Sequence, residues 1–115
     1  MQKKEEHLVV LWTSGDPEVA EKVCFMYTLN AKKQGWFEEV TLIVWGPSAK
    51  LLTENHKLQH TVHEMISIGI KLEACHVCAS MYGVADQLSE MGIDVKKMGI
   101  PLTGYLKSNC NVLTF

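Results

Sequence analysis

The sequence predicts an α/β protein, a three-layer α/β/α sandwich with a mainly parallel sheet of about five strands. Short apolar runs, typical of strands buried on both faces, alternate with segments whose apolar residues recur at helical spacing. Strands that alternate with helices are joined by crossovers, which favour a parallel sheet. The 115 residues suffice for one core and contain no repeat or linker, so we expect a single domain over 1–115.

The first strand and the first helix are indicated near the start of the chain. His7–Thr13 is a nearly continuous apolar run. Gly15 permits a sharp turn after it, Asp16 can cap a helix, and Pro17 suits the first helical turn. This helix is expected to run to about residue 33, with a core-facing stripe of Val19, Ala20, Val23, Cys24, Tyr27 and Ala31. The opposite side is expected to expose an apolar patch for a partner subunit, made of Phe25, Leu29, Trp36 and Phe37.

The remaining elements repeat the same alternation. Further strands are predicted over 40–46, 71–75, 92–99 and 111–115. A short helix or turn is predicted over 47–55, and helices over 56–68, from about 76 to 91, and over 100–108. The helix over 56–68 should bury a stripe made of Leu58, Val62, Met65 and Ile66.

Charge and hydropathy argue against several function classes. The net charge is -2, and all 11 positive side chains are lysine, so no arginine fork is present to grip phosphate or guanine. Nucleic acid is therefore not expected as a partner. The apolar run Leu8–Trp12 is shorter than a signal-peptide core or a membrane span, so we expect a cytoplasmic protein that does not bind membranes. In that compartment the four cysteines should be reduced.

The predicted topology places a candidate site at one edge of the sheet. In open parallel sheets, sites form outside the carboxyl ends of the strands, where loops lead into helices. The loop residues at this edge are Thr13, Ser14, Gly15, Gly46, Pro47, Ser48, Cys75, His76, Gly99 and Pro101, and Trp12 and Trp45 end their strands at equivalent places. The segment EACHVCASMYGV, 73–84, adds a Cys-x-x-Cys pair at the same edge.

The two cysteines of this pair are predicted to have different environments. Cys75 lies where a strand becomes a helix, so unpaired N–H groups and the positive end of the helix dipole can stabilise its thiolate. Cys78 lies on the flank of an apolar helical stripe and is expected to turn toward the core as a candidate second thiol. That stripe consists of Val77, Met81, Ala85 and Leu88. Cys75 is thus the predicted nucleophile.

Other interpretations of these motifs stay open. The Cys-x-x-Cys pair could be a thiol–disulfide redox centre. His56, His60 and His63 share one helical face and could bind a transition metal, but a solvated polar face explains them more simply, so no metal site is predicted. The turn 13–18, flanked by tryptophans, could hold a nucleotide or flavin in a binding module without catalysis. A purely structural assembly protein is a further alternative.

Four segments also carry a resemblance to a known family. They are LVVLWTSGDPEVAEK, VTLIVWGPSAKLL, GIKLEACHVCASMYGV and GIDVKKMGIPLTGYLKSNCNVLTF, which cover nearly the whole chain. They resemble the DsrE/DsrF-like family of small sulfur-relay proteins. The resemblance implies a single DsrE-like domain, assembly into homo-oligomers (trimers or hexamers), and a persulfide on the cysteine after the third strand, which matches Cys75. Cys78 falls where many relatives have a small or hydroxyl residue.

The residues and the resemblance together predict a sulfur carrier. Cys75 would attack the sulfane sulfur of a donor protein and pass it to an acceptor protein without a cofactor. His76 could assist proton transfer. The surrounding cleft would be shaped by Ser14, Gly15, Trp45 and Gly46.

Overall fold

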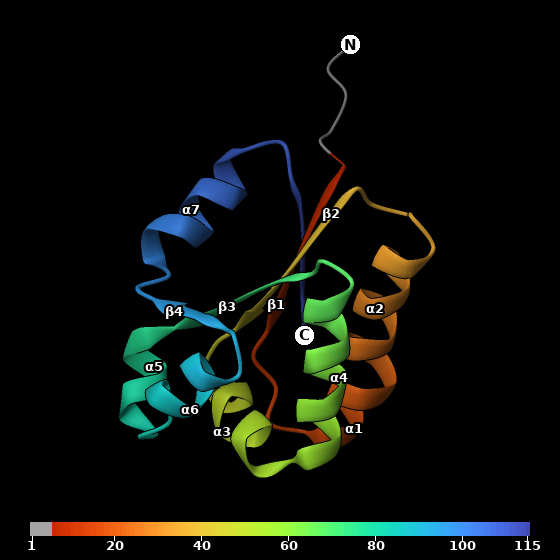
Figure 1. Cartoon of the computed structure of the whole chain (residues 1–115). Coiled ribbons are helices and arrows are strands. Elements are labelled where there is room, and N and C mark those ends of the chain that lie inside the picture. Colours follow the sequence, from red (N-terminus) through yellow and green to blue (C-terminus); the bar gives the residue numbers. More distant parts are fainter. Residues whose placement is uncertain (1–5) are drawn as a thin grey trace.

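The computed structural model of the protein describes residues 6–115, so the first five residues of the predicted domain 1–115 lie outside the described part. It contains a five-stranded, all-parallel sheet in the order β4-β3-β2-β1-β5 (Figure 1). This confirms the predicted α/β class. The strands are β1 (His7–Trp12), β2 (Glu39–Val44), β3 (Lys71–Cys75), β4 (Asp94–Lys96) and β5 (Asn111–Thr114).

The helices lie between consecutive strands. They are α1 (Pro17–Val19), η1 (Ala20–Cys24), α2 (Phe25–Lys33), α3 (Pro47–Glu54), α4 (His56–Ser67), α5 (His76–Met81), α6 (Ala85–Glu90) and α7 (Gly99–Lys107). The predicted cap of the first helix is confirmed, because the carboxylate of Asp16 accepts hydrogen bonds from the N–H groups of Glu18 at 2.8 Å and Val19 at 3.3 Å. No helix within residues 6–115 has the length and apolarity needed to cross a membrane.

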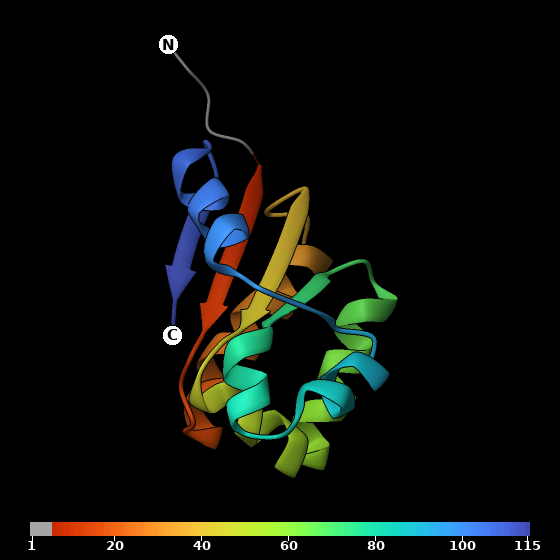
Figure 2. The same cartoon turned by 90° about the vertical axis from the view of Figure 1, so that its left-hand side faces the viewer.

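Alternation along the strands divides the core between the two faces of the sheet. Val10 and Leu42 belong to the larger cluster, which includes buried side chains from η1, α2 and α4. Val9 and Ile43 belong to a smaller cluster on the other face, which contacts α7. Figures 1 and 2 show α7 on one side of the sheet and α2 and α4 on the other, which gives the three layers.

The predicted core stripe of the first helix is partly wrong. Val23 and Tyr27 are 48% and 38% exposed, whereas Phe25 is 2% exposed and packs edge-on against Trp12 with ring centroids 4.7 Å apart. The reason is η1, a turn of π-helix over Ala20–Cys24, whose wider turn rotates the following residues about the helix axis.

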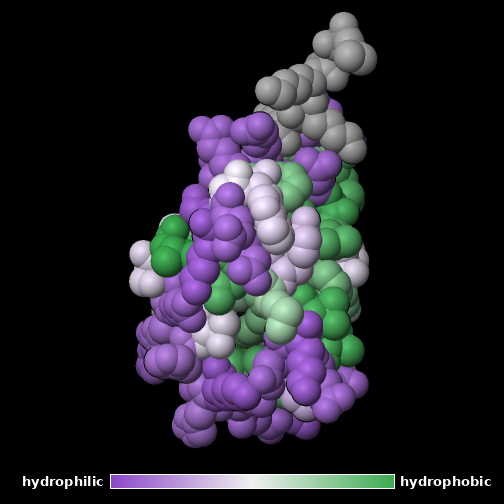
Figure 3. Space-filling view, turned by 90° about the vertical axis from the view of Figure 1, so that its right-hand side faces the viewer, coloured by the Kyte–Doolittle hydropathy of each residue, from purple (hydrophilic) through white to green (hydrophobic). Residues whose placement is uncertain are grey.

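The apolar patch predicted on this helix therefore has a different composition. Of its four predicted residues, Phe25 is buried, Leu29 and Phe37 pack partly against the core, and Trp36 is exposed. The exposed apolar side chains here are Val23, Met26, Tyr27 and Trp36. Figure 3 looks onto this side of the molecule and shows hydrophobic side chains gathered along one margin.

The helix predicted after Cys75 is also different in the structure. It is divided into α5 and α6, because Gly83 takes a left-handed conformation (φ 71) that ends α5. The predicted stripe is consequently wrong in its first half, where Val77 and Met81 are 52% and 81% exposed while Ala79 is fully buried. Leu88, in α6, is buried as predicted.

Candidate functional site

The carboxyl ends of β1 and β2 are joined by one serine. The hydroxyl of Ser48 donates a 2.6 Å hydrogen bond to the carbonyl oxygen of Trp12, and the backbone N–H of Trp45 donates to Ser48 Oγ at 3.1 Å. The loop after β1 also packs closely here, because a Cβ on Gly15 would lie 3.2 Å from Cβ of Pro47. These contacts hold two of the predicted loops together at the carboxyl end of the strands.

The thiol of Cys75 lies deeper than the sequence predicts. Cys75 ends β3, is 5% exposed, and belongs to the core cluster with Val9, Ile43 and Met98. Cys78, in α5, is only partly buried. The predicted difference in burial is therefore reversed. The cause is that Cys75 lies on the face of the sheet that α7 covers, where Leu102 and Tyr105 pack against its cluster.

Cys78 is in contact with three of the predicted site residues. Burial raises the pKa of the Cys78 thiol, and an interaction with the backbone of Gly46 lowers this pKa. The neighbouring Cys75 raises the pKa of Cys78 again, through the charge of its thiolate and through hydrogen bonding. A further hydrogen bond with the side chain of Trp45 lowers the pKa, but the net direction is upward. Gly46 has φ 75 and ψ -141, a conformation that glycine adopts readily. The structure therefore brings Cys75, Cys78, Trp45 and Gly46 together.

The remaining predicted site residues lie elsewhere along the edge. Ser14 Oγ accepts a hydrogen bond from the N–H of Asp16 at 3.1 Å, and the N–H of Ser14 donates to the carbonyl oxygen of Phe115 at 3.3 Å. Ser14 and Gly15 therefore build the turn into α1 and connect it to the end of β5. His76 is the exposed first residue of α5. The catalytic and cleft roles of all these residues stay predictions.

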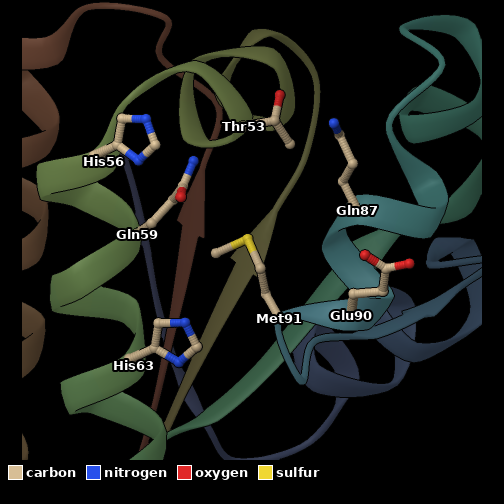
Figure 4. A pocket seen from close by; sticks show the side chains of 7 residues that line it. All are labelled: Thr53, His56, Gln59, His63, Gln87, Glu90 and Met91. Carbon is tan, nitrogen blue, oxygen red and sulfur yellow. The ribbon is translucent and has the colours of Figure 1, made fainter.

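Two of the three histidines of α4, His56 and His63, face a separate groove. A groove of about 300 Å³ between α4 and α6 is lined by Thr53, His56, Gln59, His63, Gln87, Glu90 and Met91 (Figure 4). His60 does not line it. Within residues 6–115, no three His, Cys, Asp or Glu side chains are placed to hold a metal ion, so the three-histidine metal site considered from the sequence is not formed.

A buried carboxylate next to the thiols was not predicted. The Glu73 side chain is 1% exposed and lies 2.6 Å from both Tyr105 Oη and Lys96 Nζ. Burial raises the pKa of Glu73, but hydrogen bonds from Lys96 and Tyr105 and the charges of Lys71 and Lys96 outweigh it, so the pKa is below its ordinary value. The signal in the sequence is a single carboxylate inside the strand KLEAC, because a buried charge requires a partner.

Known proteins similar to this chain support the fold and show its family. No family model matches the chain, and no curated protein matches it. A solved structure described as a conserved protein of unknown function, BT1422 from Bacteroides thetaiotaomicron, is 38% identical with a TM-score of 0.92, over 96% of this chain and 95% of that one. The crystal structure of the ychN protein from E. coli shares the fold, with a TM-score of 0.72 at 12% identity, over 96% of this chain and 99% of that one. Because identity and coverage with the Bacteroides protein are both high, this chain belongs to the same protein family as BT1422.

Proposed function

We propose that this protein carries sulfane sulfur as a persulfide on Cys75. The observation that carries this proposal is the position of Cys75 at the carboxyl end of β3, in a cluster against which the second thiol, Cys78, packs. The resemblance of the sequence to DsrE/DsrF-like sulfur-relay proteins supports the same cysteine. The partners on this proposal are a sulfur donor and an acceptor, each presenting a thiol or persulfide at the sheet edge in the cytoplasm.

The chemistry needs only thiols and balances without a cofactor. The Cys75 thiolate attacks the outer sulfur of a donor persulfide R–S–SH, forming Cys75–S–SH and releasing the donor thiolate R–S⁻. An acceptor thiolate R′–S⁻ then attacks the outer sulfur of Cys75–S–SH, which forms R′–S–SH and restores the Cys75 thiolate. His76, exposed next to Cys75, exchanges protons with the arriving and departing thiols.

Cys78 can react with the Cys75 persulfide in competition with transfer to an acceptor. Because the two thiols are in contact, the Cys78 thiolate can attack the inner sulfur of Cys75–S–SH. That step forms a Cys75–Cys78 disulfide and releases HS⁻. Cys78 and Trp45 both pack against the cluster that contains Cys75, so the lifetime of the persulfide depends on how fast an acceptor arrives.

The proposal is tested by intact-protein mass spectrometry after incubation with glutathione persulfide. In a Cys110→Ser background, which leaves Cys24, Cys75 and Cys78 as the thiols, we expect one added sulfur atom on the protein, a longer-lived adduct after Cys78→Ser, and none after Cys75→Ser. Cys24→Ser serves as the matched control, because Cys24 is fully buried and its burial raises the pKa of the thiol to about 12. Equal sulfur uptake by Cys75→Ser would contradict the proposal.

A thiol–disulfide redox function is the second candidate, favoured by the contact between the two thiols. In that case the Cys75–Cys78 disulfide is the functional product rather than a side product. The two candidates differ in what happens without a sulfur donor. A redox protein would cycle between dithiol and disulfide with a small disulfide and a small thiol, and both Cys75→Ser and Cys78→Ser would abolish that cycle equally.

A further inference from the structure

Cys110 and His7 form a thiol–imidazole pair at the amino ends of the strands, opposite to the end at which Cys75 lies. His7 is the first residue of β1, and Cys110 immediately precedes β5, the parallel strand next to β1. Sγ of Cys110 lies 3.3 Å from Nδ1 of His7, in a partly buried position. Neither residue takes part in the proposed sulfur transfer at Cys75.

The imidazole of His7 is held in place by its neighbours. Its Nε2 lies 2.9 Å from Oγ1 of Thr41, a residue that is 2% exposed on the adjacent strand. Its ring lies edge-on to the ring of Tyr105, with centroids 5.5 Å apart and an angle of 87° between the planes. Activated nucleophiles have this arrangement: the thiol lies within hydrogen-bond reach of a base, and a third group orients the other nitrogen of that base.

The surroundings also stabilise the charges that a proton transfer would create. The hydroxyl of Ser108 lies 2.8 Å from the carbonyl oxygen of Tyr105 and 3.0 Å from Sγ of Cys110, so its one proton can turn from the carbonyl to a Cys110 thiolate and stabilise it. Oε2 of Glu39 lies 3.4 Å from Nδ1 of His7, so a carboxylate also faces the nitrogen that would take up the thiol proton. In the charge-separated state both ring nitrogens donate, one to Thr41 and one to the Cys110 thiolate.

Space for a small reactant lies next to the imidazole. A pocket of about 180 Å³ is lined by His7, Lys32, Glu39, Val40, Thr41, Gly69, Lys71 and Tyr105, so it reaches the imidazole and not the Cys110 thiol itself. These residues include the titratable groups that face His7 from α2, β2, β3 and α7.

We propose that Cys110 and His7 form a second reactive-thiol site, which takes small disulfides and becomes a mixed disulfide. Nδ1 of His7 accepts the thiol proton, and Sγ of Cys110 attacks one sulfur of R–S–S–R. The new Cys110–S–S–R bond forms as the old S–S bond breaks. Cys110 is oxidised, and the other half of the reagent leaves as R–S⁻ with the electron pair and receives the proton from His7.

The experiment uses the full chain with Cys75→Ser and Cys78→Ser, so that only Cys24 and Cys110 remain. Dithiodipyridine is the probe, and the absorbance of the released thione gives the reaction rate across the pH range. We expect the rate to rise with a midpoint well below the ordinary thiol value of about 8.5. Adding His7→Gln should return the midpoint to about 8.5 and lower the rate at neutral pH about five-fold. The matched control His60→Gln removes an exposed imidazole on α4 and should change neither quantity.

Two outcomes overturn the proposal. One is an ordinary midpoint in the protein that keeps His7, and this measurement needs no variant of His7 and so does not depend on how that variant folds. The other is a label on the peptide that contains Cys24 rather than on the peptide that contains Cys110, as read by mass spectrometry after proteolysis.

Discussion

The hydroxyl of Tyr105 donates a 2.6 Å hydrogen bond to Oε1 of Glu73, and this bond connects α7 to strand β3. Lys96 on β4 pairs with the other carboxylate oxygen at 2.6 Å. Three elements thus meet at one buried carboxylate, two residues before Cys75. Burial and the interactions with Glu73 raise the pKa of Tyr105, so its hydroxyl remains a donor throughout the neutral range.

Replacing Tyr105 by Phe should destabilise the protein. The substitution removes a hydrogen bond to a charged, buried group, for which the expected loss in the free energy of unfolding is about 1.5–3 kcal/mol. Urea denaturation measures the change. Tyr82→Phe is the matched control, because Tyr82 is 41% exposed and its hydroxyl should contribute little. An unchanged unfolding midpoint in Tyr105→Phe would show that the bond contributes nothing net.

The carboxylate of Glu73 should make the stability depend on acidic pH. Its pKa in the folded state is below the ordinary value of 4.5, so the unfolded chain binds its proton first as the pH falls. The stabilisation is therefore fully present above about 4.5 and is lost as the pH falls through the lower folded-state value. Denaturation midpoints measured between neutral pH and acid should show this loss in the parent protein. In Glu73→Gln the same curve should be flatter, and an identical slope would refute the prediction.

The sheet is well predicted by local pattern, whereas the helix faces are not. Lys71–Cys75 is predicted to the residue, because a short apolar run between turn signals has few other ways to be buried. The π-helical turn before Phe25 was not predicted, because a helical wheel with a constant rotation per residue does not include a wider turn. Gly83 similarly ends α5 by its backbone conformation, which a helical wheel does not include.

The candidate site was likewise predicted only in part. Trp45 and Gly46 lie against Cys78 because the ends of parallel strands meet at one edge, which topology alone predicts. The relative burial of Cys75 and Cys78 depends on where α7 covers the sheet, and no local pattern encodes that. The same holds for Tyr105, whose partner Glu73 is brought near it only by the docking of α7.

Phe25→Ala should test the rotated face of the first helix. Because Phe25 is 2% exposed and packs on Trp12, the substitution leaves a cavity and should lower the free energy of unfolding by about 3–5 kcal/mol. Met26→Ala, at the adjacent position and 56% exposed in the single chain, should change the free energy of unfolding of the monomer by less than about 0.5 kcal/mol. Chemical denaturation of the two variants side by side decides the matter. A larger effect for Met26 would contradict the π-helical turn.

The exposed face of this helix is the surface on which we expect self-association, because the family resemblance implies homo-oligomers. Val23, Met26, Tyr27 and Trp36 line a groove of about 310 Å³ there, and the rings of Tyr27 and Trp36 lie 5.7 Å apart. Met26→Glu should place a charge in the contact and lower the sedimentation mass of an oligomer. Lys50→Glu, an exposed change on α3, should leave the mass unchanged. A monomeric parent protein would exclude this surface as a permanent interface.

Gly46→Ala should affect both stability and the Cys78 thiol. No atom lies within 4 Å of the added Cβ, so the cost comes from the backbone conformation, about 1–3 kcal/mol in the free energy of unfolding. Relaxing that strain moves the backbone group that hydrogen-bonds Cys78, which removes an interaction that lowers its pKa. Alkylation of Cys78 in a Cys75→Ser background should therefore become slower near neutral pH.

Gly104→Ala is the matched control, because Gly104 lies inside α7 with open space around it. There alanine should raise the free energy of unfolding by about 0.5–1 kcal/mol and leave the alkylation rate unchanged. Equal alkylation rates in the Gly46 variant and its parent would show that Gly46 does not tune the thiol.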